Sequence, residues 1–316
     1  MKRNIGKCLS VILLVAMLML LTGCGSKKEK VLIYTSVEDY VIEDMHKRLG
    51  EEFPNYDITV QPFATGNHAA KLLTEGKKTK CDITYDLEYA YLEQLAQAGV
   101  LADLSEYDIS IYNADTVASK HYLIQCRVGG AVILNTEVLQ EKKLAEPTSY
   151  EDLLKPEYKS LISMANPKSS GTGYMFYKSL VNAWGEEKAI EYFDKLTPNV
   201  LQYTSSGAGP VNALLHKEVA IGFGMTSQAV KQINEGDPLK VVYFDEGSPF
   251  TLYGMSMIAG KDTRPAVKEV FDFLINEYTA VSCSQYAPEQ IYKDTTFTVE
   301  HFPESIVYAD MSGDTV

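Results

Sequence analysis

The sequence contains few of the residues that build metal centres, disulfide scaffolds and aromatic cages. In 316 residues it has 5 Cys, 5 His and a single Trp, and no two cysteines stand in C-x-x-C spacing. A zinc site is therefore not supported. Cys8 and Cys24 belong to an N-terminal leader, which leaves Cys81, Cys126 and Cys283. Two of these three could pair in an exported protein, and the sequence does not say which two.

Catalytic signatures are absent as well. The sequence has no Gly-x-Ser-x-Gly, His-Glu-x-x-His or Walker pattern, and no order of Ser, His and Asp stands out. We therefore expect a binding protein that is not an enzyme and carries no cofactor. Two alternatives from other classes stay open: an enzyme that processes phosphate esters, and a surface adhesion protein.

Positive charge is scarce. The chain has 29 Lys and Arg against 42 Asp and Glu, a formal net charge of −13. Such a surface repels nucleic acid, which we exclude as a partner, and it repels anionic headgroups. An anionic ligand must therefore be held by local N–H groups and hydroxyls. The length, with 46% hydrophobic residues, is sufficient for two hydrophobic cores.

The N-terminus has the pattern of an export signal. Basic residues at positions 2, 3 and 7 precede an apolar run at 11–21, which is too short to span a bilayer as a permanent helix. The run ends in Leu21-Thr22-Gly23-Cys24, which resembles the lipobox of bacterial lipoproteins. The resemblance implies a signal peptide at 1–23, and a lipidated Cys24 with a tether at 24–30. The body would be held by lipid on the extracytoplasmic face of the cell membrane. An ordinary signal peptide with an incidental cysteine is the alternative.

Strands and helices alternate in the pattern of an α/β protein. Apolar runs at 31–34, 57–60 and 81–85 predict three strands, each followed by a segment with helical spacing of its apolar residues. Three such units in sequence predict a parallel sheet. Ligand groups in open sheets of this kind belong at the carboxyl ends of the strands, which here carry Ser36, Thr65 and Asp86.

Hydroxyl side chains recur where strands are followed by helices. The fullest case is the stretch at 166–174, Asn-Pro-Lys-Ser-Ser-Gly-Thr-Gly-Tyr, between a buried strand and a helix. Ser36, Ser205 and Thr226 stand at three further helix starts. Free N–H groups and the positive end of a helix dipole suit a bound anion there. A helix cap explains each hydroxyl alone, and Ser36 with Asp39 fits a capping box, but four such sites together favour binding.

Seven short motifs follow one another along most of the chain. They lie at 65–66, 82–83, 96–101, 166–174, 204–207, 218–223 and 246–249. In this order the chain, from residue 31 to about 310, resembles the extracellular solute-binding proteins of ABC importers. The branch that it resembles includes binders of ferric iron, aminoethylphosphonate, sugar phosphates and thiamine.

The resemblance implies a two-lobed periplasmic-binding-protein-like α/β fold, with two crossing strands between the lobes and the ligand in the cleft. Lobe 1 would comprise 31–126 with 255–316, and lobe 2 would comprise 127–254. A small-molecule ligand, an ABC permease and its ATPase are the implied partners, and we expect a monomer. A further helix usually follows the segment that matches 308–312 in relatives, whereas this chain stops at Val316.

A phosphonate or an organophosphate is the ligand that we favour. Ser170, Gly171 and Thr172 would bind the anionic head, with Ser36 and Ser205 closing on it. Two residues, Asp86 and Tyr253, would contact the other end. The remaining predicted ligand-binding residues are Thr65, Ser206 and Thr226.

Three other ligands stay open. Ferric binders of this family use two adjacent tyrosines, and this chain has no such pair among its 21 Tyr. Thiamine is commonly sandwiched by aromatic rings, whereas Trp184 stands at the end of a predicted helix. A polyamine would need several acids in the cleft, and Asp86 and Glu246 are the visible candidates. We expect His68, one turn inside a helix, at the surface rather than on a ligand.

Overall fold

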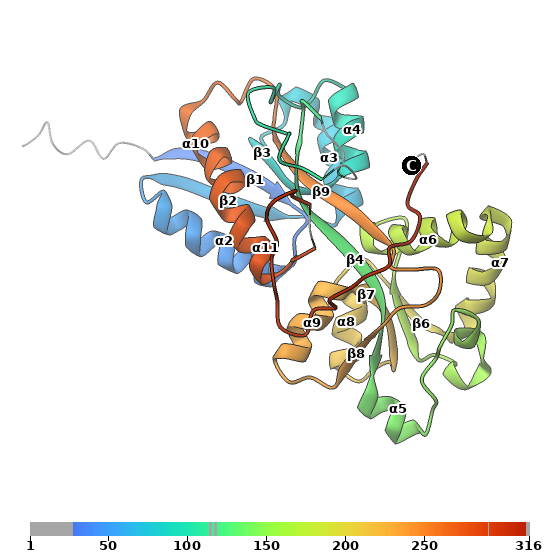
Figure 1. The fold of residues 1–316 in the computed structure, drawn as a ribbon. Helices are drawn as coiled ribbons and strands as arrows, with labels where there is room; N and C mark the ends of the chain where they lie inside the picture. Colours follow the sequence, from blue (N-terminus) through green and yellow to red (C-terminus); the bar gives the residue numbers. More distant parts are fainter. Residues whose placement is uncertain (1–27, 114–115, 117–118, 290, 314–316) are drawn as a thin grey trace, which may run out of the picture.

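The computed structural model describes residues 28–113, 116, 119–289 and 291–313. The predicted signal peptide, Cys24 and most of the tether lie outside these residues. Within them, no helix combines the length and the apolar composition needed to cross a membrane. The described chain forms two α/β lobes, which occupy the upper left and the lower right of Figure 1.

The first lobe is a sheet with helices on both faces. β1 pairs in parallel with β2 and with β3, which confirms the predicted parallel sheet. Val31 and Ile33 of β1 pack with α2 and α10, whereas Tyr34 packs with α3 and α4, the two-residue period of a strand that is covered on both sides. The elements are β1 (Glu29–Thr35), α2 (Asp39–Glu52), β2 (Tyr56–Pro62), α3 (Thr65–Glu75), β3 (Ile83–Glu88), α4 (Tyr89–Gln97), α10 (Pro265–Phe273), a π-helical turn (Leu274–Tyr278) and α11 (Thr279–Gln285).

The second lobe repeats this layered arrangement. β5 pairs in parallel with both β6 and β7. Helices α6 and α7 cover one face of the sheet, and α8 and α9 cover the other. The elements are α5 (Thr136–Lys142), β5 (Ile162–Ala165), α6 (Gly171–Trp184), α7 (Glu186–Leu196), β6 (Val200–Thr204), α8 (Gly209–Leu215), β7 (Ile221–Met225), α9 (Thr226–Asn234) and β8 (Leu239–Val242).

Two antiparallel strands run from one lobe to the other. β4 (Leu123–Asn135) pairs with β9 (Phe250–Met257) through Gly129, with β7 from Gly130 onward and with β8 from Val132 onward. Because β4 and β9 are shared, the strands follow one order, β2-β1-β3-β9-β4-β7-β5-β6, with β8 paired to β4 (Figure 1). The crossing by two strands that the resemblance implied is present, in β4 and β9. The predicted lobe boundaries fall inside β4 and β9.

The C-terminal segment contacts both lobes. In the first lobe the Asn113 N–H donates to the Ile291 carbonyl oxygen at 2.8 Å. In the second lobe Ser248 forms a parallel bridge with Tyr308, and the Asn182 side chain donates to the Asp310 carbonyl oxygen at 2.9 Å. Figure 1 shows this segment, in dark red, passing from one lobe to the other.

Two local predictions at the first strand ends are wrong. α2 begins at Asp39 with Glu38 as its N-cap residue, and no side chain caps it, so Ser36 and Asp39 form no capping box. β3 continues to Glu88, whereas the sequence placed Asp86 between the strand and a helix. Asp86 instead stands at a bulge of β3 with a φ of 56°, a conformation that Asp adopts more readily than most residues.

Gly173 allows the first turn of α6 to lie against the end of β5. A Cβ there would lie 2.4 Å from the Ala165 carbonyl oxygen, a backbone atom. We expect Gly173→Ala to lower the free energy of unfolding by about 2 kcal/mol. The matched control is Gly50→Ala in α2, where a Cβ meets nothing within 4 Å and the gain in helix propensity is about 0.5–1 kcal/mol. Urea unfolding measures both variants, and a Gly173→Ala protein as stable as the control would contradict the packing argument.

Candidate functional site

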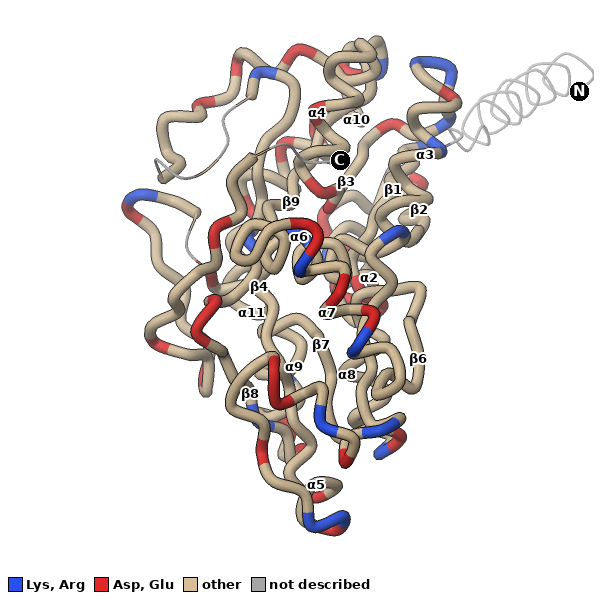
Figure 2. The backbone as a smooth tube through the Cα atoms, turned by 90° about the vertical axis from the view of Figure 1, so that its right-hand side faces the viewer, with Lys and Arg blue, Asp and Glu red and all other residues tan. Residues whose placement is uncertain are grey.

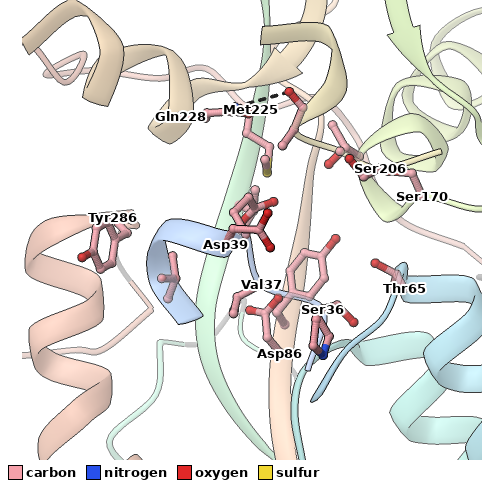
Figure 3. Close-up of a pocket in the computed structure, with 18 of the residues that line it drawn as sticks. Ser36, Val37, Asp39, Thr65, Asp86, Ser170, Ser206, Met225, Gln228 and Tyr286 are labelled. Atoms are coloured by element: carbon pink, nitrogen blue, oxygen red, sulfur yellow. Dashed lines mark hydrogen bonds between the residues drawn. The ribbon is translucent and has the colours of Figure 1, made fainter. Parts of the chain in front are cut away.

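A cavity of about 370 Å³ lies between the two lobes. The first lobe contributes the chain after β1, the start of α3 and Asp86, and the second contributes the loop before α6, the turn before α8 and the start of α9. Figure 3 shows Ser36 and Thr65 on one side of this cavity with Ser170 and Ser206 on the other. Both lobes therefore present hydroxyl groups to one space.

Eight of the ten predicted ligand-binding residues line this cavity. Gly171 and Thr226 are not part of the lining. Thr226 is fully buried, and its hydroxyl lies 3.1 Å from that of Tyr243, so it is engaged outside the cavity. The eight that line it are Ser36, Thr65, Asp86, Ser170, Thr172, Ser205, Ser206 and Tyr253.

The N-terminus of α6 opens into the cavity. Ser170 is its N-cap residue, but the Ser170 side chain makes no capping hydrogen bond. The N–H groups of a first helical turn have no partner inside the helix, and a helix of 14 residues adds the positive end of its dipole. Gly207, before α8, packs here: a Cβ on it would lie 2.3 Å from Thr172 Oγ1 and 3.5 Å from Ser170 Oγ. Two hydroxyls and a helix N-terminus therefore converge.

Tyr253 reaches the same point from β9. A Cβ on Gly171 would lie 2.4 Å from the Tyr253 hydroxyl oxygen, so a side chain at this position would displace the Tyr253 hydroxyl. The Tyr253 ring is buried, and it lines the cavity. The sequence placed Tyr253 at the opposite end of the ligand from Ser170, whereas the geometry places its hydroxyl beside the first turn of α6.

His68 is buried next to the cavity, so its predicted surface position is wrong. Its exposed fraction is 0% because α3 packs this side chain against Tyr34 and Phe63. The Nδ1 atom lies 2.9 Å from Ser36 Oγ, and Nε2 lies 3.0 Å from Thr84 Oγ1. Burial lowers the pKa of His68 to about 3, so the imidazole is neutral. A buried ring, rather than a helix cap, therefore holds the Ser36 hydroxyl.

The lobes touch on two sides of the cavity. On one side the Gly66 N–H of α3 donates to the Ser169 carbonyl oxygen before α6, at 3.4 Å. On another side the Lys231 ammonium of α9 lies 5.2 Å from the ring centroid of Tyr40 in α2. The two lobes are therefore in contact beside the cavity.

Residues 78–293 match the family of bacterial extracellular solute-binding proteins. The chain belongs to this family. This solute-binding protein is therefore of the class that binds small solutes outside the cytoplasm and delivers them to ABC permeases, rather than of an enzyme class.

A sequence relative and two solved structures resemble this solute-binding protein over most of its length. An uncharacterized protein of Haemophilus influenzae is 28% identical over 284 residues, which cover 87% of this chain and 81% of that protein. The periplasmic binding protein AfuA from Actinobacillus pleuropneumoniae, with exogenous fructose-6-phosphate bound, is 24% identical, with a TM-score of 0.76 over 87% of this chain and 88% of its own. A periplasmic thiamin binding protein is 15% identical, with a TM-score of 0.75 over 90% of this chain and 89% of its own.

The solute-binding protein also lines its cavity with acids that the sequence reasoning missed. Glu38 and Asp39 directly follow the end of β1 and join Asp86 in the lining. Their place at the same strand end as Ser36 was the signal that could have identified them. Burial raises the pKa of Glu38 to about 7. Burial, with Glu38 nearby, raises the pKa of Asp86 well above its usual range, although Gln125 donates to Asp86 Oδ1 at 3.0 Å.

Metal-binding and basic groups are not part of this site. Within the residues that the structure describes, no group of three or more His, Cys, Asp or Glu is arranged to hold a metal ion. No Lys or Arg stands among the described residues that line the cavity. Cys81, Cys126 and Cys283 are buried free thiols, and none of the three pairings left open by the sequence is formed.

The raised pKa of Glu38 predicts that the ligand-free protein loses stability as the pH rises. Its pKa of about 7 in the folded state lies above the ordinary value of 4.5. Between pH 4.5 and about 7 the folded protein therefore binds more protons than the unfolded chain, so the free energy of unfolding falls as the pH rises through this range. Glu38→Gln should therefore flatten the decrease in the free energy of unfolding between about pH 5 and about pH 8. Urea unfolding at both pH values measures this change. The control is Glu51→Gln at an exposed position of α2, and a slope unchanged by Glu38→Gln would refute the assignment.

Proposed function

We propose that this solute-binding protein captures a small phosphonate or organophosphate in the interlobe cleft and delivers it to a membrane permease. The observation that carries this proposal is the convergence of the α6 N-terminus with the hydroxyls of Ser170, Thr172 and Tyr253. Backbone N–H groups and hydroxyls can hold a phosphate-type anion without a basic side chain. In a closed cleft such charge-assisted bonds are strengthened by the low local dielectric.

The acids in the lining suit the other end of such a ligand. Glu38, Asp39 and Asp86 would repel a ligand that carried only negative charge. An ammonium group would pair with the ionised forms of Glu38 and Asp86 and lower their raised pKa values on binding. We therefore favour an anionic head joined to a protonated amine, with hydroxyl-bearing organophosphates next.

A polyamine is the second candidate, and the same acids favour it. Glu246, which the sequence suggested, is not in the cavity lining, but Glu38 and Asp39 are. A polyamine would leave the N-terminus of α6 without an anionic partner, which is why it ranks second.

Iron and thiamine fit the lining less well. The described residues offer no metal-binding group of three His, Cys, Asp or Glu. Trp184 packs edge-on against Tyr150 and Tyr192 in the core of the second lobe rather than in the cavity. Catalysis on a phosphate ester would need a base beside Ser170, whereas His68 contacts Ser36 and Thr84. Release of inorganic phosphate from a panel of phosphate esters would contradict our reading.

A ligand panel tests the proposal directly. Native mass spectrometry of the purified protein identifies a retained ligand, and thermal-shift measurements then compare 2-aminoethylphosphonate, ethylphosphonate, fructose 6-phosphate, spermidine, thiamine and ferric citrate. We expect the largest stabilisation from 2-aminoethylphosphonate. A response to spermidine, thiamine or ferric citrate alone would overturn the phosphonate assignment. No response at all would favour a surface protein with an unused cleft.

Thr172 and Thr226 form a matched pair for mutation, because both stand at helix starts and only Thr172 lines the cavity. Thr172→Val should weaken the binding of 2-aminoethylphosphonate by about tenfold or more, since it removes a hydrogen bond to a charged group. Thr226→Val should leave the affinity unchanged. Isothermal titration calorimetry measures both dissociation constants, and equal effects of the two variants would count against the proposed anion site.

We also propose that Cys24 carries the lipid anchor of this protein. Cys24→Ala should abolish the incorporation of labelled palmitate and release the protein from the membrane fraction. Cys8→Ala, in the same N-terminal leader, is the control and should change neither. Labelling that survives in Cys24→Ala would assign the lipid elsewhere.

A further inference from the structure

Three polar side chains form a short chain of hydrogen bonds that starts at the cavity wall. Ser36 follows β1 and lines the cavity, His68 comes from α3, and Thr84 comes from β3. His68 and Thr84 both have an exposed fraction of 0%. Of these three residues, a solute in the cavity can therefore contact only Ser36. The ring nitrogens of His68 join the two hydroxyls, at 2.9 Å to Ser36 and 3.0 Å to Thr84.

A neutral imidazole has one donor and one acceptor nitrogen, so this chain has two possible directions. In one direction Nδ1–H donates to Ser36 Oγ and Thr84 donates its O–H to Nε2. The O–H of Ser36 is then free to point into the cavity. In the other direction Nε2–H donates to Thr84 and Ser36 donates to Nδ1, so that Ser36 offers only lone pairs to the cavity. The tautomer of His68 therefore decides whether Ser36 can donate to a ligand.

Burial of Thr84 favours the first direction. Within the described part of the chain, Nε2 of His68 is the acceptor that lies within reach of the Thr84 hydroxyl. If Thr84 accepted from the ring instead, its own O–H would stay unsatisfied in a buried place, which is costly. Ser36 does not face this constraint because the cavity can supply an acceptor. Only the Thr84 O–H would lose its hydrogen-bond partner if the direction were reversed. The free-energy cost of that loss favours the Nδ1–H tautomer of His68.

We propose that His68 is a positioning residue that makes Ser36 a hydrogen-bond donor to the anionic head of the solute. This inference rests on the proposed function, since it concerns the same cleft and the same class of ligand. Glu38, Asp39 and Asp86, when ionised, offer only acceptors on this side of the cavity. In the first lobe, a donor at Ser36 would therefore bind the anionic head, whereas the three carboxylates would bind an ammonium group.

Amide variants at position 68 test this role. The amide of Asn occupies roughly the place of Nδ1 and can still donate to Ser36, whereas the amide of Gln extends toward the place of Nε2 and Thr84. We expect His68→Gln to weaken the binding of 2-aminoethylphosphonate by about tenfold, and His68→Asn to weaken it less. In a Ser36→Ala background the two variants should bind equally, because the group that His68 orients is gone. A difference that persists in that background would overturn the proposal.

Nitrogen NMR of the wild-type protein with 15N-labelled histidine reads the tautomer directly and does not depend on whether the variants fold. We expect a protonated Nδ1 and an unprotonated Nε2 at His68 in the ligand-free protein. A protonated Nε2 would overturn this inference while leaving the proposed function intact. If instead the wild-type protein binds neither 2-aminoethylphosphonate nor fructose 6-phosphate, the proposed function fails, and the NMR measurement still decides the direction of the chain.

Discussion

At Gly171 and Gly173 the first turn of α6 lies closer to its neighbours than a Cβ atom normally does. A Cβ at Gly173 would lie 2.4 Å from the Ala165 carbonyl oxygen, and one at Gly171 would lie 2.4 Å from the Tyr253 hydroxyl oxygen. Gly173 thus allows the N-terminus of α6 to pack against the end of β5, and Gly171 allows it to pack against β9. The backbone N–H groups of that turn are held toward the cleft and away from bulk water when the lobes close. Because unsatisfied N–H groups are costly in such a place, the closed cleft favours a ligand that accepts hydrogen bonds.

The charge of the site follows from the same closure. Acidic positions occur along both lobes (Figure 2). An acidic protein would ordinarily be a poor receptor for an anion, and the cavity has carboxyl groups in its lining. Burial raises the pKa values of Glu38 and Asp86, so removal from water favours their neutral forms. The repulsion that an anionic head meets is therefore smaller than the number of acids suggests. A cationic group on the same ligand would restore the ionised forms and turn them into partners, at the cost of releasing protons.

The sequence predicted the elements of this fold better than the partners of its side chains. The strands predicted at 31–34, 57–60 and 81–85 are present as β1, β2 and β3, since short runs of apolar side chains report directly which segments are buried. Hydroxyls at strand ends likewise identified one edge of the sheet, and eight of ten predicted residues line the cavity there. Single polar residues were harder, because their roles depend on contacts distant in sequence. His68 looked exposed by helical position, but it contacts Ser36 in the loop after β1 and Thr84 in β3.

The junction between the lobes is held by more than the two crossing strands that the family resemblance implied. The guanidinium of Arg127 in β4 lies 4.8 Å from the ring centroid of Phe250 in β9 and 5.0 Å from that of Tyr308 in the C-terminal segment. Glu289 accepts from the Gly129 N–H at 2.8 Å and from the Tyr308 hydroxyl at 2.7 Å. Breaking such buried contacts would leave charges without partners, which is strongly unfavourable. The two crossing strands and the C-terminal segment therefore meet in one buried cluster at the junction of the lobes.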